Sequence, residues 1–181
     1  KYNVNPDIAI FGKALGNGYA ITSIIGKKEI MEAAQSTFIS STFWTERIGP
    51  AAALKTLEIM AKERSWEQIT NKGNELRKIW LNIAAKNNLK ININGIKALS
   101  GFSFNKNNRE YKTLITQEML KKGYLASTLC YLSISHTSEI LEKYGNCLDD
   151  VFKLISKCEK GSNIYEFIKY PLCHNGFERL N

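Results

Sequence analysis

The chain has 181 residues, of which 44% are hydrophobic and 23% are charged, and its formal net charge at pH 7 is +8. This length and composition indicate a globular protein with a sizeable core. No apolar run is long enough to cross a bilayer, and the first residues contain neither a signal-peptide core nor an initiator Met.

The positive charge raises the alternative of nucleic-acid binding. The lysines are dispersed, however, and they are not interleaved with aromatic residues, which favours a solvated basic surface. The cysteines form no CxxC pair and have no His at metal-ligand spacing. We therefore expect no metal site and a cytoplasmic protein with free thiols at Cys130, Cys147, Cys158 and Cys173.

The stretch that carries the most chemical information begins with an apolar run over residues 8–11, which ends at Gly12 and is followed by Lys13. The run predicts a strand buried on both faces, as in parallel sheets. Gly12, Gly16 and Gly18 would let a ligand approach the backbone, so Lys13 is placed to offer its amine to a bound carbonyl compound. Burial would keep part of that amine neutral. Spacing alone leaves open a solvated lysine in an ordinary glycine-containing loop.

Two phosphate-binding motifs are excluded in this stretch. A Walker loop needs a Gly and a Ser or Thr where this chain has Asp7 and Ala14. A dinucleotide fingerprint needs a third glycine, which does not follow Gly16 and Gly18 at the required spacing.

Residues 5–19, Asn-Pro-Asp-Ile-Ala-Ile-Phe-Gly-Lys-Ala-Leu-Gly-Asn-Gly-Tyr, resemble the Schiff-base lysine segment of class III pyridoxal-phosphate aminotransferases. That family includes ornithine aminotransferase and glutamate-1-semialdehyde aminomutase. The similarity continues in weaker pieces to residues 173–177. It implies an α/β fold of the type I pyridoxal-phosphate transferases. Residues 1–64 would be the C-terminal part of the cofactor-binding large domain, and residues 65–181 a linking helix and a small α+β C-terminal domain. It also implies that the chain is the C-terminal portion of a longer enzyme.

The resemblance assigns roles to two residues. Lys13 would hold pyridoxal 5'-phosphate as a Schiff base and serve as general acid/base. Thr42 would donate to the cofactor phosphate across a subunit boundary. We therefore expect a homodimer with shared active sites that acts on a small-molecule amino donor and acceptor. From chemistry alone, Thr42 or Thr45 could instead cap the helix expected to begin near Ile48.

The reaction is less defined than the cofactor. Residues 44–47 stand where many relatives have Gly-Gly-Asn-Pro, and they resemble a subgroup associated with modified-sugar or surface-polysaccharide pathways. We favour an aminotransferase on this ground; the alternatives are a glutamate-1-semialdehyde aminomutase and a non-enzymatic basic binding module. The family's carboxylate for the pyridine nitrogen would lie upstream of residue 1, so Asp7 is not assigned that role. This piece alone is expected to be inactive.

The rest of the chain predicts alternating strands and helices. Up to residue 83 we expect a strand over residues 20–26, a short helix over 27–32, a helix ending near Arg64 and another opened by Ser65. Further on we expect strands over 89–93 and 98–104 that are separated by Asn94-Gly95, a helix stopped by Gly123, and strands over 124–130 and 131–135.

The last part of the chain is expected to be a helix followed by an ordered tail. Thr137 should cap that helix, and His136 just before it is expected to be a structural hydrogen-bonding residue. Residues 161–180 contain four aromatic side chains, so we expect this extended segment to pack against the protein.

Overall fold

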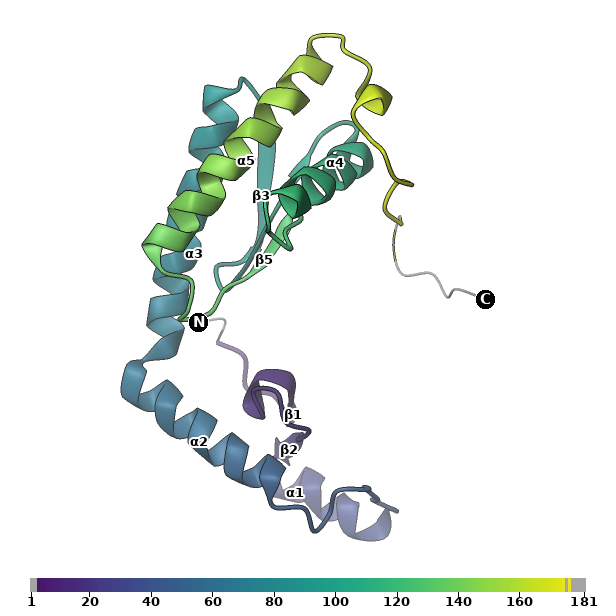
Figure 1. Ribbon diagram of the computed structural model, residues 1–181. Coiled ribbons are helices and arrows are strands. Elements are labelled where there is room, and N and C mark those ends of the chain that lie inside the picture. The colour runs from purple at the N-terminus through teal and green to yellow at the C-terminus, as the bar shows by residue number, and fades with distance from the viewer. Residues whose placement is uncertain (1–2, 175, 177–181) are drawn as a thin grey trace. The chain divides into compact units, whose positions relative to one another are not determined.

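The computed structural model describes residues 3–174 and 176, and the chain divides into two compact units (Figure 1). The N-terminal unit ends at Ser65, and the C-terminal unit begins at Trp66. Among the described residues, no helix has the length and apolar character that a membrane span requires. All four cysteines are free thiols.

The N-terminal unit contains a two-stranded sheet. Strands β1 (Ile8–Phe11) and β2 (Ser23–Gly26) pair antiparallel, with Ile8 opposite Gly26 and Phe11 opposite Ser23. The prediction of parallel strands is wrong for this pair, and β2 is shorter than expected. The remaining elements are helical: η1 (Lys13–Leu15), α1 (Lys28–Met31), η2 (Glu32–Ser36) and α2 (Ile48–Glu63).

Much of the apolar surface in this unit is exposed, contrary to the prediction of strands buried on both faces. Ile10 is 72% exposed, and Ile24 and Ile25 are each 55% exposed. On α2, Leu54 is 70% exposed. The physical reason is that a sheet of two strands and one long helix offer too little surface to cover these side chains.

The C-terminal unit is an antiparallel sheet packed against helices (Figure 1). Its three strands lie in the order β3-β4-β5, formed by β3 (Ile91–Ile96), β4 (Leu99–Phe104) and β5 (Leu129–Tyr131). The helical elements are α3 (Ser65–Lys86), which begins at the predicted residue, α4 (Asn108–Lys121), α5 (Ser138–Glu159) and η3 (Ile164–Glu166).

The core of this unit is a cluster of rings centred on β4. Phe102 lies 4.8 Å from Trp80 of α3 and 5.8 Å from Phe152 of α5, measured between ring centroids. Phe104, two residues along and therefore on the same face of the strand, lies 5.0 Å from Tyr111 of α4. All three helices thus pack on one face of the sheet. Each buried ring pair adds about 0.5–1.5 kcal/mol beyond the burial itself.

Three expectations about turns and caps meet different outcomes. The β3–β4 hairpin does not turn at Asn94-Gly95, because Gly95 pairs with Ser100 and the chain reverses after Ile96. The guanidinium of Arg77 holds this part of the strand by donating to the carbonyl oxygens of Asn94 and Gly95 at 3.2 and 2.8 Å. Gly123 ends α4 with a φ of +84°. Thr137 caps α5, since its hydroxyl accepts the backbone N–H of Ile140 at 3.3 Å.

Between Gly123 and Thr137 the structure has one short strand, β5, and not the two predicted strands. Its residues Leu129–Tyr131 pair with β4. Beyond them the pairing continues by one hydrogen bond on each side, from the N–H of Phe102 to the carbonyl of Thr128 and from the N–H of Leu132 to that of Ala98, both at 3.0 Å. The apolar residues on either side produced the wrong prediction because they contact the core from irregular backbone; Leu132, for example, is 8% exposed.

The tail packs against α4 as predicted, as far as it is described. Gln117 binds it twice: its amide donates to the carbonyl of Phe167 at 2.9 Å, and its oxygen accepts the N–H of Lys169 at 2.7 Å. One turn earlier, the hydroxyl of Thr113 accepts the N–H of Cys173 at 2.9 Å. Residues 167–173 therefore run along α4, antiparallel to the helix. Phe177 lies outside the described residues.

Candidate active site

Lys13 lies directly after β1, on a tight turn. The carbonyl oxygen of Gly12 accepts the N–H of Leu15 at 3.1 Å, and that of Lys13 accepts the N–H groups of Gly16 and Asn17, both at 3.2 Å. Lys13 itself has a φ of +50°, in the left-handed region that residues with a Cβ rarely adopt. This conformation costs about 1–2 kcal/mol, and such strain is concentrated at functional sites.

Gly16 fixes the shape of the lysine turn. A Cβ at this position would lie 2.1 Å from the carbonyl oxygen of Tyr19, so no other residue fits without moving the backbone. At Gly12 the added Cβ would meet only a methyl group of Thr22, at 3.2 Å. Position 16 requires glycine because the turn brings the carbonyl of Tyr19 too close for any side chain, and not because glycine is flexible.

The Lys13 side chain is exposed, and within the described residues it makes no hydrogen bond or ion pair. The burial expected for this lysine is therefore not present within the chain. The reason is the same as for the exposed strands, since β1 belongs to a sheet of only two strands. The amine stands free at the end of a strand on a turn of fixed geometry.

Thr42 lies in a turn over residues 42–45 and is exposed. The hypothesis that Thr42 or Thr45 caps the next helix is wrong, because the N-cap of α2 is Arg47 and no side chain accepts a hydrogen bond there. The first N–H groups of α2 are thus left without a side-chain acceptor. The structure forms no hydrogen bond between Lys13 and Thr42.

The start of α2 is held against the segment that follows the lysine turn. Gly49 is buried, and a Cβ on it would lie 2.7 Å from the carbonyl oxygen of Ala20. Only glycine permits this approach of the helix to the backbone of Ala20. The lysine turn and the entrance of α2 are therefore packed together within the N-terminal unit.

Two other polar residues singled out in the sequence have structural roles. Asp7 accepts a hydrogen bond from the ammonium of Lys27 at 2.6 Å and so joins the two strands at their ends. His136 contacts the hydroxyl of Ser133 at 2.9 Å through Nδ1, which also accepts the N–H of Ser133 at 3.1 Å. The expectation of a structural His136 is confirmed.

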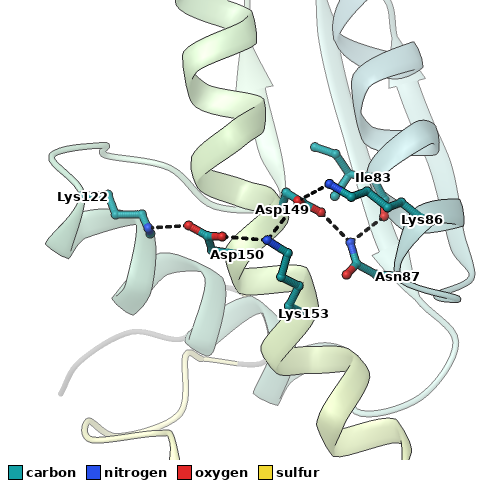
Figure 2. A network of polar contacts seen from close by, with 7 residues as sticks. All are labelled: Ile83, Lys86, Asn87, Lys122, Asp149, Asp150 and Lys153. Carbon is teal, nitrogen blue, oxygen red and sulfur yellow. Dashed lines mark hydrogen bonds and ion pairs between the residues drawn. The ribbon is translucent and has the colours of Figure 1, made fainter.

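Several titratable groups of the C-terminal unit have shifted pKa values. Burial raises the pKa of Tyr144, and it also raises the pKa of Tyr111 to about 12. Burial opposes ionisation of Asp149, but hydrogen bonds from Lys86, Asn87 and Lys153 outweigh it and hold the pKa of this carboxyl below its usual value (Figure 2). Among the described residues, no group of His, Cys, Asp or Glu is arranged to hold a metal ion.

Comparison with known proteins identifies the family. The model of the family "Aminotransferase class-III" matches residues 1–139, and the chain belongs to this family. It is 32% identical over 150 residues to the 3-aminobutyryl-CoA aminotransferase of Cloacimonas acidaminovorans (strain Evry), covering 77% of this chain and 36% of that protein. It is 28% identical over 166 residues to the glutamate-1-semialdehyde 2,1-aminomutase of Methanosphaera stadtmanae, covering 82% and 39%.

The fold comparison agrees. The structure of the pyridoxal-phosphate internal aldimine form of the FumI protein from Sphingopyxis sp. MTA144 matches with a TM-score of 0.80 at 21% identity, over 91% of this chain and 41% of that chain. The mixed α/β structure thus matches about two-fifths of a type I pyridoxal-phosphate transferase. The chain likewise spans less than two-fifths of the length of both curated relatives named above.

The residues present fit part of a pyridoxal-phosphate site. The free amine of Lys13 suits the cofactor's aldehyde. The hydroxyl of Thr42 and the uncapped N–H groups of α2 are donors of the kind that bind phosphate. Asp7 is paired with Lys27 and is not assigned to a pyridine nitrogen.

Proposed function

We propose that this chain carries the cofactor-binding lysine of a pyridoxal-phosphate-dependent enzyme that transfers an amino group between small molecules. The observation that carries the proposal is the geometry of Lys13, an unpaired amine placed in the left-handed region directly after β1. Membership of the class III aminotransferase family supports it. The domain interpretation belongs to the same proposal, with the N-terminal unit as part of the cofactor-binding domain.

The chemistry divides between the cofactor and the protein. Pyridoxal phosphate, when bound, supplies the electron sink that stabilises negative charge on the substrate carbon next to the amino group. Lys13 would hold the cofactor through its Nζ atom. The same amine, when free, would take a proton from the substrate carbon and return one, as general base and then general acid.

Thr42 contributes to the same proposal from a second copy of the chain. Its exposed hydroxyl is free to donate to a phosphate, and the resemblance places that phosphate in a neighbouring copy's site. A single chain is then not required to bring Lys13 and Thr42 together. The protein would be a homodimer with two shared sites, and its four free thiols are compatible with the cytoplasm.

An aminotransferase and an aminomutase both remain candidates, because curated relatives of both kinds match the chain at similar coverage. We place the aminotransferase first on account of residues 44–47. The two are distinguished by incubating the natural protein with a ¹⁵N-labelled amino donor and a keto acceptor. An aminotransferase moves the label between molecules, whereas an aminomutase retains it within one.

Variants of the natural protein test the proposal. Lys13→Ala should abolish amino transfer together with the visible absorbance that bound pyridoxal phosphate gives. Thr42→Ala should first weaken cofactor retention, so that activity returns when excess pyridoxal phosphate is added. Lys28→Ala, another exposed lysine of the N-terminal unit, is the matched control and should change neither. Full activity in Lys13→Ala would overturn the role of Lys13, whereas absence of amino transfer and of bound-cofactor absorbance in the natural protein would favour the non-enzymatic alternative.

A further inference from the structure

The C-terminal unit contains a cleft whose lining includes neither Lys13 nor Thr42. It has a volume of about 420 Å³, within the range of small-molecule sites. Three segments far apart in the sequence form it: the turn after α3, the end of β4 with the loop that follows, and the end of α5. We name it the Lys90–Lys106 cleft, lined by Asn88, Leu89, Lys90, Phe104, Asn105, Lys106 and Glu159.

Hydrogen bonds fix the first wall, residues 88–90. Asn87, which precedes it, is buried and donates from its side chain to the carbonyl of Ile83 at 2.9 Å and to Asp149 at 2.7 Å (Figure 2). The hydroxyl of Ser156 donates to the carbonyl oxygen of Asn87 at 2.8 Å. Two residues of α5, Asp149 and Ser156, therefore anchor the residue that precedes this wall.

The other two walls are anchored as well. Asn92 donates to the side-chain oxygen of Asn105 at 2.6 Å, so the amide nitrogen of Asn105 keeps its own protons for a ligand. The hydroxyl of Tyr111 donates to Glu159 at 2.6 Å, which leaves the second oxygen of Glu159 able to accept. The walls of the cleft are thus held by hydrogen bonds before any ligand arrives.

The two lysines of the cleft outnumber its one carboxylate. Among the described residues, neither Lys90 nor Lys106 forms an ion pair, whereas Lys86, Lys122 and Lys153 of the same unit all bind carboxylates. Two lysines and two asparagines line the cleft together with one acidic residue, Glu159. The buried side chains of Leu89 and Phe104 provide an apolar floor.

From this arrangement we infer that the Lys90–Lys106 cleft binds a small phosphate monoester that carries hydroxyl groups. A phosphate monoester has a charge of about −1.5 to −2 at pH 7. The two lysines together carry a charge of +2, so they balance a phosphate monoester more closely than a ligand with a single carboxylate. A hydroxyl at the other end donates to Glu159, and the carbon atoms between lie over Leu89 and Phe104. This is a binding site in addition to the proposed cofactor site.

Titration of the ¹⁵N-labelled natural protein with glycerol 3-phosphate tests the inference. The amide signals of residues 88–90 and 104–106 should shift and saturate together. Lys90→Gln and Lys106→Gln should each weaken binding roughly tenfold, the loss expected for one hydrogen bond to a charged group. Lys78→Gln, an exposed lysine outside the cleft, and Thr42→Ala, in the proposed cofactor site, should leave the affinity unchanged.

A second comparison tests the role of Glu159. Glu159→Gln keeps an oxygen for Tyr111 but removes the charge, so it should reduce the preference for glycerol 3-phosphate over inorganic phosphate. Absence of saturable shifts at residues 88–90 would overturn the inference. Equal weakening by Lys78→Gln would also overturn it, because binding would then reflect general surface charge.

Discussion

The carboxylate of Asp149 on α5 lies 2.7 Å from the side-chain amide of Asn87 at the end of α3, and this buried contact joins the two longest helices of the chain (Figure 2). Lys86 also reaches Asp149, at 2.6 Å, but its side chain is 64% exposed. Asn87 and Lys86 donate to Asp149 at nearly the same distance, but Asn87 is buried and Lys86 is exposed. Substituting each residue in turn therefore separates their contributions to the free energy of unfolding.

Removal of the buried donor should cost more than removal of the exposed one. Asn87→Ala removes the buried side-chain donor to Asp149 and to the carbonyl of Ile83, at a cost of about 1.5–3 kcal/mol in the free energy of unfolding. Lys86→Ala should cost less than about 1 kcal/mol, as solvent-exposed ion pairs do. Urea unfolding of the two variants measures both values, and a larger loss for Lys86→Ala would contradict the ranking.

The low pKa of Asp149 predicts how stability depends on pH. The folded state favours the ionised carboxylate, so its contribution is present above the ordinary Asp pKa of about 3.9 and is lost as the pH falls through the lower folded value. Asp149→Asn should therefore be less stable than the natural sequence at pH 6, and the difference should shrink below about pH 4. Urea midpoints measured between pH 6 and pH 3 provide the test; a constant difference would argue against this assignment.

Gln117 should hold the C-terminal tail. Gln117 is 6% exposed and its side chain binds two backbone groups of the tail, so Gln117→Ala should loosen residues 167–169 and cost about 1–3 kcal/mol. Limited trypsin digestion should then cleave faster after Lys169. Thr116→Ala on the exposed side of the same helix is the control, and equal cleavage in both variants would show that Gln117 does not hold the tail.

Local chemistry in the sequence predicts the parts of the fold that depend on neighbouring residues. Gly123 with its positive φ and the Thr137 cap are found where the residues indicate them. The prediction of a turn at Asn94-Gly95 is wrong because a distant side chain, Arg77, binds the carbonyls of these residues within a strand. The spacing of residues in the sequence does not indicate this contact.

The candidate site shows the same division between local and distant determinants. The position of Lys13 after a strand could be predicted, whereas its left-handed φ and its exposure could not. Exposure depends on how much of the sheet is present to cover β1, which a residue pattern does not contain. The Lys90–Lys106 cleft was also missed, since its walls come from three segments that are joined only by tertiary hydrogen bonds.

The most direct test of the central claim is to find which lysine binds pyridoxal phosphate. The natural protein is incubated with the cofactor, reduced with borohydride so that the bond becomes permanent, digested, and analysed by mass spectrometry. The account predicts one dominant pyridoxyl-modified residue, Lys13. Modification spread over exposed lysines such as Lys28, with Lys13 labelled no more than they are, would contradict it.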